Sequence, residues 1–494
     1  MSVAPRLERP PNPLTELLNR LGAILFTVTF GIVLGLQYIT PNKRVLSVIL
    51  ALLMFGLPWR LDLITGLGIM AIALPFPHTT IFGNTNLAFI LLMIVTWLLR
   101  VTMRQNAPPH RSPIDAPLIS LFISYVASFY NVTAGNLGVS LGCFEMMMAT
   151  WLMFYLVASI PQTQRDFHRL LGFQAVSVLL VCLTAVFEMT FPGRPLIPGW
   201  IELGSKMALD ANNVRVGSAF HDYELLCEYC AISAPLILFL FLRTNSILLR
   251  TAYGGLLVLV VFVLFSTVTR GGAISLAVGL LYLTWLVRRR LSMVAVTITA
   301  GATAAGLIGM NWFVVTFTHT GNLFERMAGS KFKGLLPDTR AVTWPEAWDR
   351  IFEHPFLGHG PNYAVFVGTR AYYFPHSLYL YVANNVGFIG FAIFAWLLWI
   401  MFRTTRPTTD DLRHADFVRS YMVIARTQMV VFLVDEIKIE YLRNDVYAFQ
   451  IWMMFALMVA GHRLLGPDAA HVSPADAHRR APLGAPPSAR SVTS

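Results

Sequence analysis

The stretch DTRAVTWPEAWDRIFEHPFLGHGPNYAVFVGTRAYYFPHSLYLYVANN, from Asp338 to Asn385, is polar and rich in aromatic residues, arginine and histidine. It lies between apolar segments that are long enough to cross a bilayer. Much of the other sequence between apolar segments is short. This pattern predicts one large loop, residues 313–383, outside a bundle of helices. We expect the chemistry of the protein in that loop.

The composition is typical of an integral membrane protein. Of the 494 residues, 56% are hydrophobic and 13% are charged, whereas a soluble domain carries about 25% charged residues. We therefore predict an all-α, polytopic fold of about 12 to 14 transmembrane helices, since each needs about 20 apolar residues. These spans are expected near residues 21–39, 45–59, 61–76, 87–103, 115–130, 138–160, 171–191, 226–242, 250–269, 272–287, 291–312, 384–402, 418–436 and 445–464.

The apolar segments also predict how the chain is divided. The lead-in, residues 1–20, has no apolar core, so no cleavable signal is expected and the segment is predicted to be cytoplasmic. Helices are predicted over 21–312 and 384–465, on either side of the loop. The Pro/Ala/Ser/His-rich tail, residues 466–494, is predicted to be disordered and cytoplasmic.

The net charge is +11, but the basic residues are spread over the loops between predicted helices and do not form one patch. This placement argues against a nucleic-acid partner. Basic residues fall in alternate short loops, as expected for the cytoplasmic side of a membrane protein. The same count places 192–225, 267–271 and 313–383 on the opposite, extracytoplasmic face. The basic residues that mark the cytoplasmic side are Arg100, Arg104, Arg111, Arg165, Arg169, Arg243, Arg250, Arg288, Arg289, Arg290, Arg403, Arg406 and Arg413.

One apolar segment carries unusual charge. Arg426 is expected to interrupt the span 418–436. That span ends in DEIKIEYLRND, from Asp435 to Asp445, and the span is therefore expected to lie partly in the membrane interface. Glu145 and Glu188 are further carboxylates within or near apolar runs. A carboxylate in a membrane span is a functional candidate by default, although an internal ion pair is an equal alternative.

The cysteines and carboxylates do not predict a metal site. Cys227 and Cys230 form a CEYC pair, but no second Cys/His pair is near enough to complete a zinc set, so packing is favoured. The chain has no D-x-D pair of the kind that metal-dependent sugar transfer uses. No metal or other cofactor is therefore expected, and arginines would have to neutralise a leaving diphosphate.

Several residues on the predicted outer face have suitable chemistry. Arg215 precedes a span, Arg270 is followed by two glycines that permit a tight turn and the close approach of a ligand, and Arg340 lies in the large loop. Arginine binds phosphate oxygens with a planar fork. His376, in the segment YFPHSLYL, can accept a proton from a hydroxyl near neutral pH.

Each of these residues has a structural alternative. Arg215 could be a snorkelling or surface side chain, and His376 could cap the next helix. A charge such as Arg270 at a membrane boundary is costly unless it is paired or functional. The G-x-G of HPFLGHGPN (residues 354–362) neither follows a strand nor opens a helix of a nucleotide-binding unit, so no nucleotide site is expected.

Together these motifs resemble the O-antigen ligase and O-antigen polymerase family. The resemblance lies in R-x-G-x-x-x (Arg215 to Phe220), T-R-G-G (Thr269 to Gly272) and R-x-x-x-W (Arg340 to Trp344). It continues in HPFLGHGPNY and PHSLYLYVANNVGFIGF and covers roughly residues 210–395. The sequence departs from the family at HDYE (residues 221–224), where relatives often have an Asn-Pro-Asn-like turn.

The resemblance implies a GT-C-like helical fold and a multi-pass glycosyltransferase of the bacterial inner membrane. Its members take a glycan from undecaprenyl diphosphate on the periplasmic face and pass it, without a metal, to lipid A-core, to another lipid-linked repeat unit or to a protein hydroxyl. The family's two arginines correspond to Arg215 and Arg270, and its loop histidine to His376.

From these residues we predict an inverting transfer to an acceptor hydroxyl, in lipopolysaccharide or exopolysaccharide assembly. Arg215 and Arg270 would hold the diphosphate, and His376 would activate the acceptor. The choice between a ligase and a polymerase remains open. A transporter or flippase of lipid-linked glycan is the alternative from another class of protein. Residues expected to shape the sugar groove are Arg340, Tyr372, Tyr373 and Tyr379.

Overall fold

The computed structural model describes most of the chain. It describes residues 62–76, 79–80, 83–191, 194, 196, 215–290, 292–318, 322–329, 332–333, 336–337, 340–362, 365–367, 370–373 and 375–466. The predicted lead-in 1–20, the spans 21–39 and 45–59, and the tail beyond 466 lie outside these residues.

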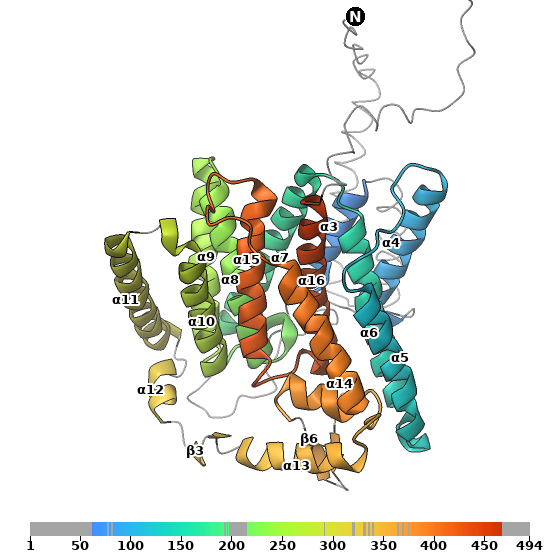
Figure 1. The fold of residues 1–494 in the computed structure, drawn as a ribbon. Helices are drawn as coiled ribbons and strands as arrows, with labels where there is room; N and C mark the ends of the chain where they lie inside the picture. Colours follow the sequence, from blue (N-terminus) through green and yellow to red (C-terminus); the bar gives the residue numbers. More distant parts are fainter. Residues whose placement is uncertain are drawn as a thin grey trace, which may run out of the picture.

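The described residues form a bundle of apolar helices that run roughly side by side (Figure 1). Seven of the described helices are long and apolar enough to cross a membrane, which confirms the prediction of a polytopic helical membrane protein. The helices of the bundle are α3 (Leu63–Ala73), α4 (Thr85–Thr102), α5 (Asp115–Ser128), α6 (Leu137–Ser159), α7 (Gln164–Thr190), α8 (Tyr223–Arg243), α9 (Ile247–Ser266), α10 (Arg270–Val287), α11 (Met293–Thr318), α14 (Leu378–Thr404), α15 (Phe417–Asp435) and α16 (Asp445–Leu464).

Short elements connect the helices. Between α11 and α14, the helix α13 (Arg340–Glu353) runs across one end of the bundle, with α12 (Leu323–Ala328) and two small hairpins nearby (Figure 1). The antiparallel hairpins are β1 (Thr79–Thr80) with β2 (Gly83–Asn84), β3 (Phe332–Lys333) with β4 (Leu336–Pro337), and β5 (Val365–Val367) with β6 (Arg370–Tyr373). The 3-10 turns are η1 (Phe129–Asn131), η2 (Ala134–Asn136), η3 (Ser218–Phe220), η4 (Arg288–Arg290) and η5 (Tyr441–Arg443).

Several helices extend beyond the apolar windows that predict them, because their first turns are polar and capped. The α7 helix begins at Gln164, with Thr163 and Asp166 forming a capping box. The α8 helix begins at Tyr223, after the side chain of Asp222 accepts hydrogen bonds from two backbone amides. Because α11 ends at Thr318 and α14 begins at Leu378, the large loop spans 319–377 rather than 313–383.

The core of the bundle surrounds α8, whose residues 225–237 are all buried. It packs against α9, α10 and α15, and α15 in turn packs against α10 and α16. By contrast, much of α9 and α10 is exposed. Exposed apolar faces are expected where helices meet lipid, since lipid tails are as apolar as the side chains. Because α8 is buried and packs against three other helices, it fixes the positions of residues on those helices relative to one another.

The basic connections meet at one end of the bundle. Arg243 donates a hydrogen bond of 2.9 Å to the carbonyl of Ala415, and Arg290 pairs with Asp410 at 3.1 Å. These contacts bring the α8–α9, α10–α11 and α14–α15 connections together, as the charge pattern predicts. The described helices of the large loop, α12 and α13, lie at the other end of the bundle (Figure 1).

The expectation that Arg426 interrupts its span is wrong. The α15 helix runs without a break from Phe417 to Asp435. The guanidinium of Arg426 lies 3.0 Å from the ring centroid of Phe402, and its Nε donates to the hydroxyl of Tyr282 at 3.2 Å. The neighbouring helices α10 and α14 thus accommodate this charge inside the bundle.

A different span is broken. Gly387, inside α14, has φ 65° and ψ −173°, outside the helical region. The loop segment 354–360 fills the gap: His359 N donates to the carbonyl of Asn384 at 2.8 Å, and Phe388 N donates to that of Pro355 at 2.7 Å. A Cβ atom on Gly387 would lie 2.3 Å from the carbonyl carbon of Phe356. Because broken helices leave backbone groups unsatisfied, this segment is a structural part of α14.

Candidate functional site

The turn between α9 and α10 is the centre of the site. It contains Thr267, Val268 and Thr269, and Arg270 is the first residue of α10. Cβ atoms on the next two glycines would collide with protein: the one on Gly271 would lie 1.8 Å from Cε of Lys438. The two glycines do permit a close approach, as the sequence predicts. The groups that approach them, however, are side chains of the protein.

Arg215 is held against this turn. It is 6% exposed, so the alternative of a solvated surface side chain is wrong. Its Nε donates to the carbonyl of Thr267 at 2.9 Å, and a terminal nitrogen donates to Oγ1 of Thr269 at 3.0 Å. Its guanidinium lies 3.1 Å from the ring centroid of Tyr223. The structure thus brings Arg215 to the residues directly before Arg270.

Glu188 holds the loop that follows Arg215. Its carboxylate accepts hydrogen bonds from the backbone amides of Gly217 at 3.2 Å and Ser218 at 2.6 Å. These contacts join the end of α7 to the loop and the turn η3 before α8. Of the two carboxylates singled out in apolar runs, Glu188 is therefore a structural anchor, and Glu145 is exposed on α6.

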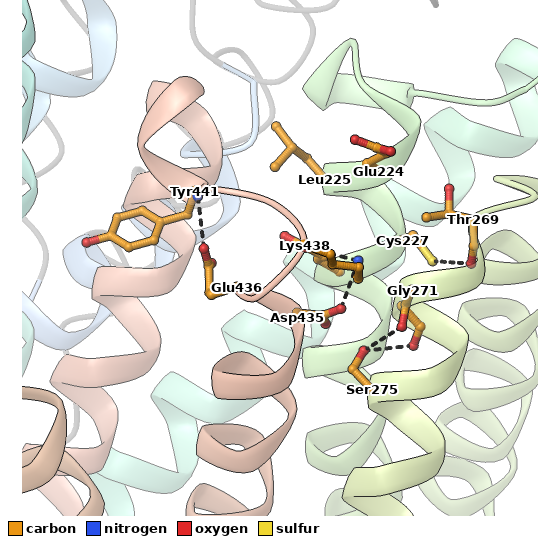
Figure 2. A network of polar contacts seen from close by, with 12 residues as sticks. Glu224, Leu225, Cys227, Thr269, Gly271, Ser275, Asp435, Glu436, Lys438 and Tyr441 are labelled. Carbon is orange, nitrogen blue, oxygen red and sulfur yellow. Dashed lines mark hydrogen bonds and ion pairs between the residues drawn. The ribbon is translucent and has the colours of Figure 1, made fainter. Parts of the chain in front are cut away.

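Several buried carboxylates lie on or near the α15–α16 connection, and two of them contact Lys438. Nζ of Lys438 lies 3.0 Å from Asp435 and 3.3 Å from Glu228 of α8, and both carboxylates are fully buried (Figure 2). Glu436 and Glu440 are buried as well. We call Glu228, Asp435, Glu436 and Glu440 the carboxylate cluster.

The cluster alters the protonation of its members. Burial opposes the charge of Lys438, yet the neighbouring Asp435 and Glu228 carboxylates raise the pKa of its ammonium above the ordinary value. Burial also raises the pKa of the Glu436 carboxyl well above its usual range, and repulsion from Glu228 adds to the effect. The α15–α16 connection therefore carries both a fixed ammonium, at Lys438, and a carboxyl with a raised pKa, at Glu436.

Arg340 joins the large loop to this cluster. One of its terminal nitrogens donates to the carbonyl of Lys438 at 2.7 Å. Burial lowers the pKa of its guanidinium, while the charges of Glu224 and Glu440 oppose that shift. Arg340 therefore lies at the same end of the bundle as the α9–α10 turn.

His376 lies just before α14, in a segment that is hydrogen-bonded to the α15–α16 connection. It is half-buried and adopts a left-handed conformation, with φ 47°. Two residues later, the amide of Leu378 donates to the carbonyls of Glu436 at 2.9 Å and Ile439 at 3.0 Å. The N-cap of α14 is Ser377, so the alternative that His376 caps this helix is wrong.

The predicted tyrosines occupy different places. The hydroxyl of Tyr379 donates to the carbonyl of Leu433 at 2.9 Å, so it is tied to the end of α15. Tyr372 and Tyr373 belong to β6, where Tyr373 pairs with Val365. Their side chains lie outside the described part of the structure.

Sequence reasoning missed the carboxylate cluster and Lys438. Its signal was DEIKIEYLRND, a dense charged run between two apolar spans, which reads equally well as a solvated interfacial loop. Only the fold brings Glu228, from a different span, within reach of Lys438. Structural context, rather than spacing along the chain, identifies these residues.

Residues 230–395 match the family model described as O-antigen ligase. This part of the chain is similar to the O-antigen ligase family. The family match begins inside α8 and ends inside α14, so it includes Arg270, Arg340 and His376 and leaves out Arg215. No curated protein matches the chain. The resemblance seen in the sequence is confirmed, and with it a role of the O-antigen ligase or polymerase type in polysaccharide biosynthesis.

The cysteines of the protein pack inside it. Sγ of Cys227 lies 3.6 Å from the carbonyl of Thr269, and a Cβ atom on Gly272 would lie 2.4 Å from the same sulfur. Cys230 is buried beside Cys182. Within the described ranges, no group of three or more His, Cys, Asp or Glu residues is arranged to hold a metal ion.

Proposed function

We propose that the protein transfers a glycan from undecaprenyl diphosphate to an acceptor hydroxyl on the periplasmic side of the bacterial inner membrane. The observation that supports this most is the convergence of Arg215, Arg270, Arg340 and Lys438 at one end of the bundle. The basic connections gather at the other end. If those are cytoplasmic, the site faces the periplasm.

In the proposed reaction, Arg270 contacts the diphosphate. It opens α10, whose N-terminus already favours an anion. Arg215 holds the preceding turn and adds positive charge behind it. Both would stabilise the charge that develops as the bond between the sugar and the diphosphate breaks, without a metal ion.

His376 is proposed to act as the general base. The acceptor oxygen attacks the anomeric carbon from the side opposite the diphosphate, and the configuration inverts. The electron pair of the broken bond leaves with the diphosphate, and the proton of the acceptor passes to the imidazole. Arg340, Tyr372, Tyr373 and the ring of Tyr379 would line the sugar groove.

One observation favours a transporter as the second candidate. Broken helices often form the substrate sites of transporters, and α14 is broken at Gly387. In this protein, however, loop residues 354–360 fill the break. The buried carboxylates and Lys438 gather at one end of the bundle instead of near its middle, which supports an enzyme.

The decisive experiment uses the purified full chain with a lipid-linked glycan donor and candidate acceptors. We expect transfer in the presence of a metal chelator. The Arg270→Ala variant should reach the membrane normally and lose about 10²–10³ in rate, the usual cost of losing one such charge-stabilising donor. Arg406→Ala, an exposed arginine at the basic end, is the matched control and should behave as wild type.

Two results would overturn the proposal. One is unchanged transfer by Arg270→Ala, and the other is translocation of the glycan lipid without transfer. A gel of surface polysaccharide from a deletion strain then separates the two types of enzyme. Single repeat units indicate a polymerase, whereas lipid-linked polymer that is absent from lipid A-core indicates a ligase.

A further inference from the structure

The α13 helix, in the sequence RAVTWPEAWDRIFE, has three different faces. Ala347 and Ile351 are buried against the bundle. Trp348 and Phe352, one turn apart, are 41% and 63% exposed. Around the helix from them, Glu353 is exposed and belongs to a charged face with Glu346 and Asp349. A helix with a buried, an aromatic and an acidic face contacts three different surroundings.

The exposed aromatic residues form one surface. The ring of Phe352 stacks on that of Trp348, with their centroids 6.0 Å apart, and both rings contact Phe388 of α14 at 6.1 and 6.4 Å. Phe356, just beyond the end of α13, is 68% exposed. We call Trp348, Phe352, Phe356 and Phe388 the aromatic surface. Contiguous exposed apolar surface of this kind marks a contact site.

The aromatic surface continues into the exposed side of α14. Phe388 is the first residue after the break, and exposed apolar residues follow it: Ile389 is 51% exposed and Trp399 is 53% exposed. At the far end, the guanidinium of Arg403 lies 4.7 Å from the ring centroid of Trp399. From Phe388 to Arg403 the helix rises roughly 22 Å, within the hydrocarbon thickness of about 30 Å.

These positions place the aromatic surface at a membrane boundary. Arg403 and Trp399 mark one boundary, because a snorkelling arginine and a tryptophan are typical of the interface. Phe388, which contacts Trp348 and Phe352 of α13, then lies towards the other boundary, and α13 crosses this end of the bundle (Figure 1). Aromatic side chains are enriched at this depth, and amphipathic helices lie there in the plane of the membrane.

We propose that α13 lies in the membrane interface, with its aromatic surface against phospholipid and its acidic face towards water. The partner is the bilayer itself, because the aromatic surface is continuous with the exposed apolar side of a membrane-spanning helix. The consequence is that Arg340, at the start of the same helix, is held at the depth of the lipid headgroups. This inference does not depend on the reaction that the protein catalyses.

Site-directed spin labelling tests the proposal on the full chain in phospholipid nanodiscs. A nitroxide is attached to Phe352→Cys or, as the matched control one residue away, to Glu353→Cys. The four native cysteines are buried. Wild-type protein treated with the same nitroxide reagent checks that they do not react. We expect the label at 352 to collide mainly with oxygen, which dissolves in lipid. The label at 353 should collide mainly with a water-soluble nickel chelate.

Two outcomes would overturn the proposal. If both labels are open to the nickel chelate, the aromatic surface faces water. If the label at 352 is shielded from both oxygen and the chelate, the surface is covered by protein. Should Phe352→Cys fail to fold, Phe356→Cys supplies the same measurement from the most exposed residue of the aromatic surface.

Discussion

Nε of Arg215 donates a hydrogen bond of 2.9 Å to the carbonyl oxygen of Thr267, which is 52 positions away in the sequence. The bond ties the loop before α8 to the turn before α10. It also uses part of the donor capacity of Arg215 on the protein itself. Arg215 therefore supports the geometry of Arg270, in addition to the charge that it is proposed to provide.

This relationship predicts the effect of a single hydroxyl. Thr269→Val removes the Oγ1 atom that accepts a hydrogen bond from Arg215 at 3.0 Å. We expect the rate of glycan transfer to fall by about tenfold or more, since a hydrogen bond to a charged group contributes about 1.5–3 kcal/mol. The control is Thr251→Val, whose exposed hydroxyl bonds only within α9. Equal rates for the two variants would show that Arg215 does not act through this contact.

Lys438 is predicted to stabilise the folded protein. Lys438→Met leaves the fully buried carboxylates of Asp435 and Glu228 without their ammonium. Breaking a buried ion pair in this way costs about 3–5 kcal/mol. The measurement is the midpoint of thermal unfolding in detergent. The double variant Lys438→Met with Asp435→Asn should recover part of the loss, and a single variant as stable as wild type would contradict the prediction.

Gly387 is predicted to be required for the break in α14. Gly387→Ala places a Cβ atom where φ is 65° and the carbonyl of Phe356 is in contact, which costs on the order of 1–3 kcal/mol for the backbone conformation alone. Gly255→Ala in α9 is the matched control, because its Cβ would meet only open space. It should leave thermal stability unchanged or raise it slightly. Similar midpoints for both variants would refute the role of the break.

The carboxylate cluster predicts how stability depends on pH. The pKa of Glu436 is raised in the folded protein, so this state binds more protons than the unfolded chain between the ordinary and the raised pKa. The contribution of Glu436 to stability therefore falls as pH rises through that window. Glu436→Gln should reduce the loss of thermal stability as pH rises above the ordinary pKa of a glutamate. A variant with the same slope as wild type would exclude Glu436 as the titrating group.

The sequence allows the fold to be predicted well where hydropathy decides it. The apolar runs locate α3 to α11 and α14 to α16, most of them within three residues, since crossing a bilayer requires long apolar helices; the polar first turn of α7 and the ends of α11 and α14 next to the large loop extend further. The break in α14 is not visible in this way. It depends on loop residues 354–360, which are hydrogen-bonded to Asn384 and Asn385 and read as a simple turn in the sequence.

The candidate site, too, could be predicted only in part from the sequence. Arg215, Arg270, Arg340 and His376 could be selected because charge at a membrane boundary is costly without a purpose. Their actual partners could not. The two glycines after Arg270 admit Lys438 and Cys227, and neither contact is encoded by any local spacing. Tertiary contacts between separate spans decide such features.

The junction between loop residues 354–360 and Gly387 restricts how this protein can be recombined with its relatives. The loop cannot be exchanged by itself, because its main chain forms hydrogen bonds with the broken part of α14. A chimera that exchanges residues 340–376 alone would combine the loop segment 354–360 of one parent with the broken α14 of the other. Functional exchange of the extramembrane segment will require transplanting α14 through Phe388 as a single unit.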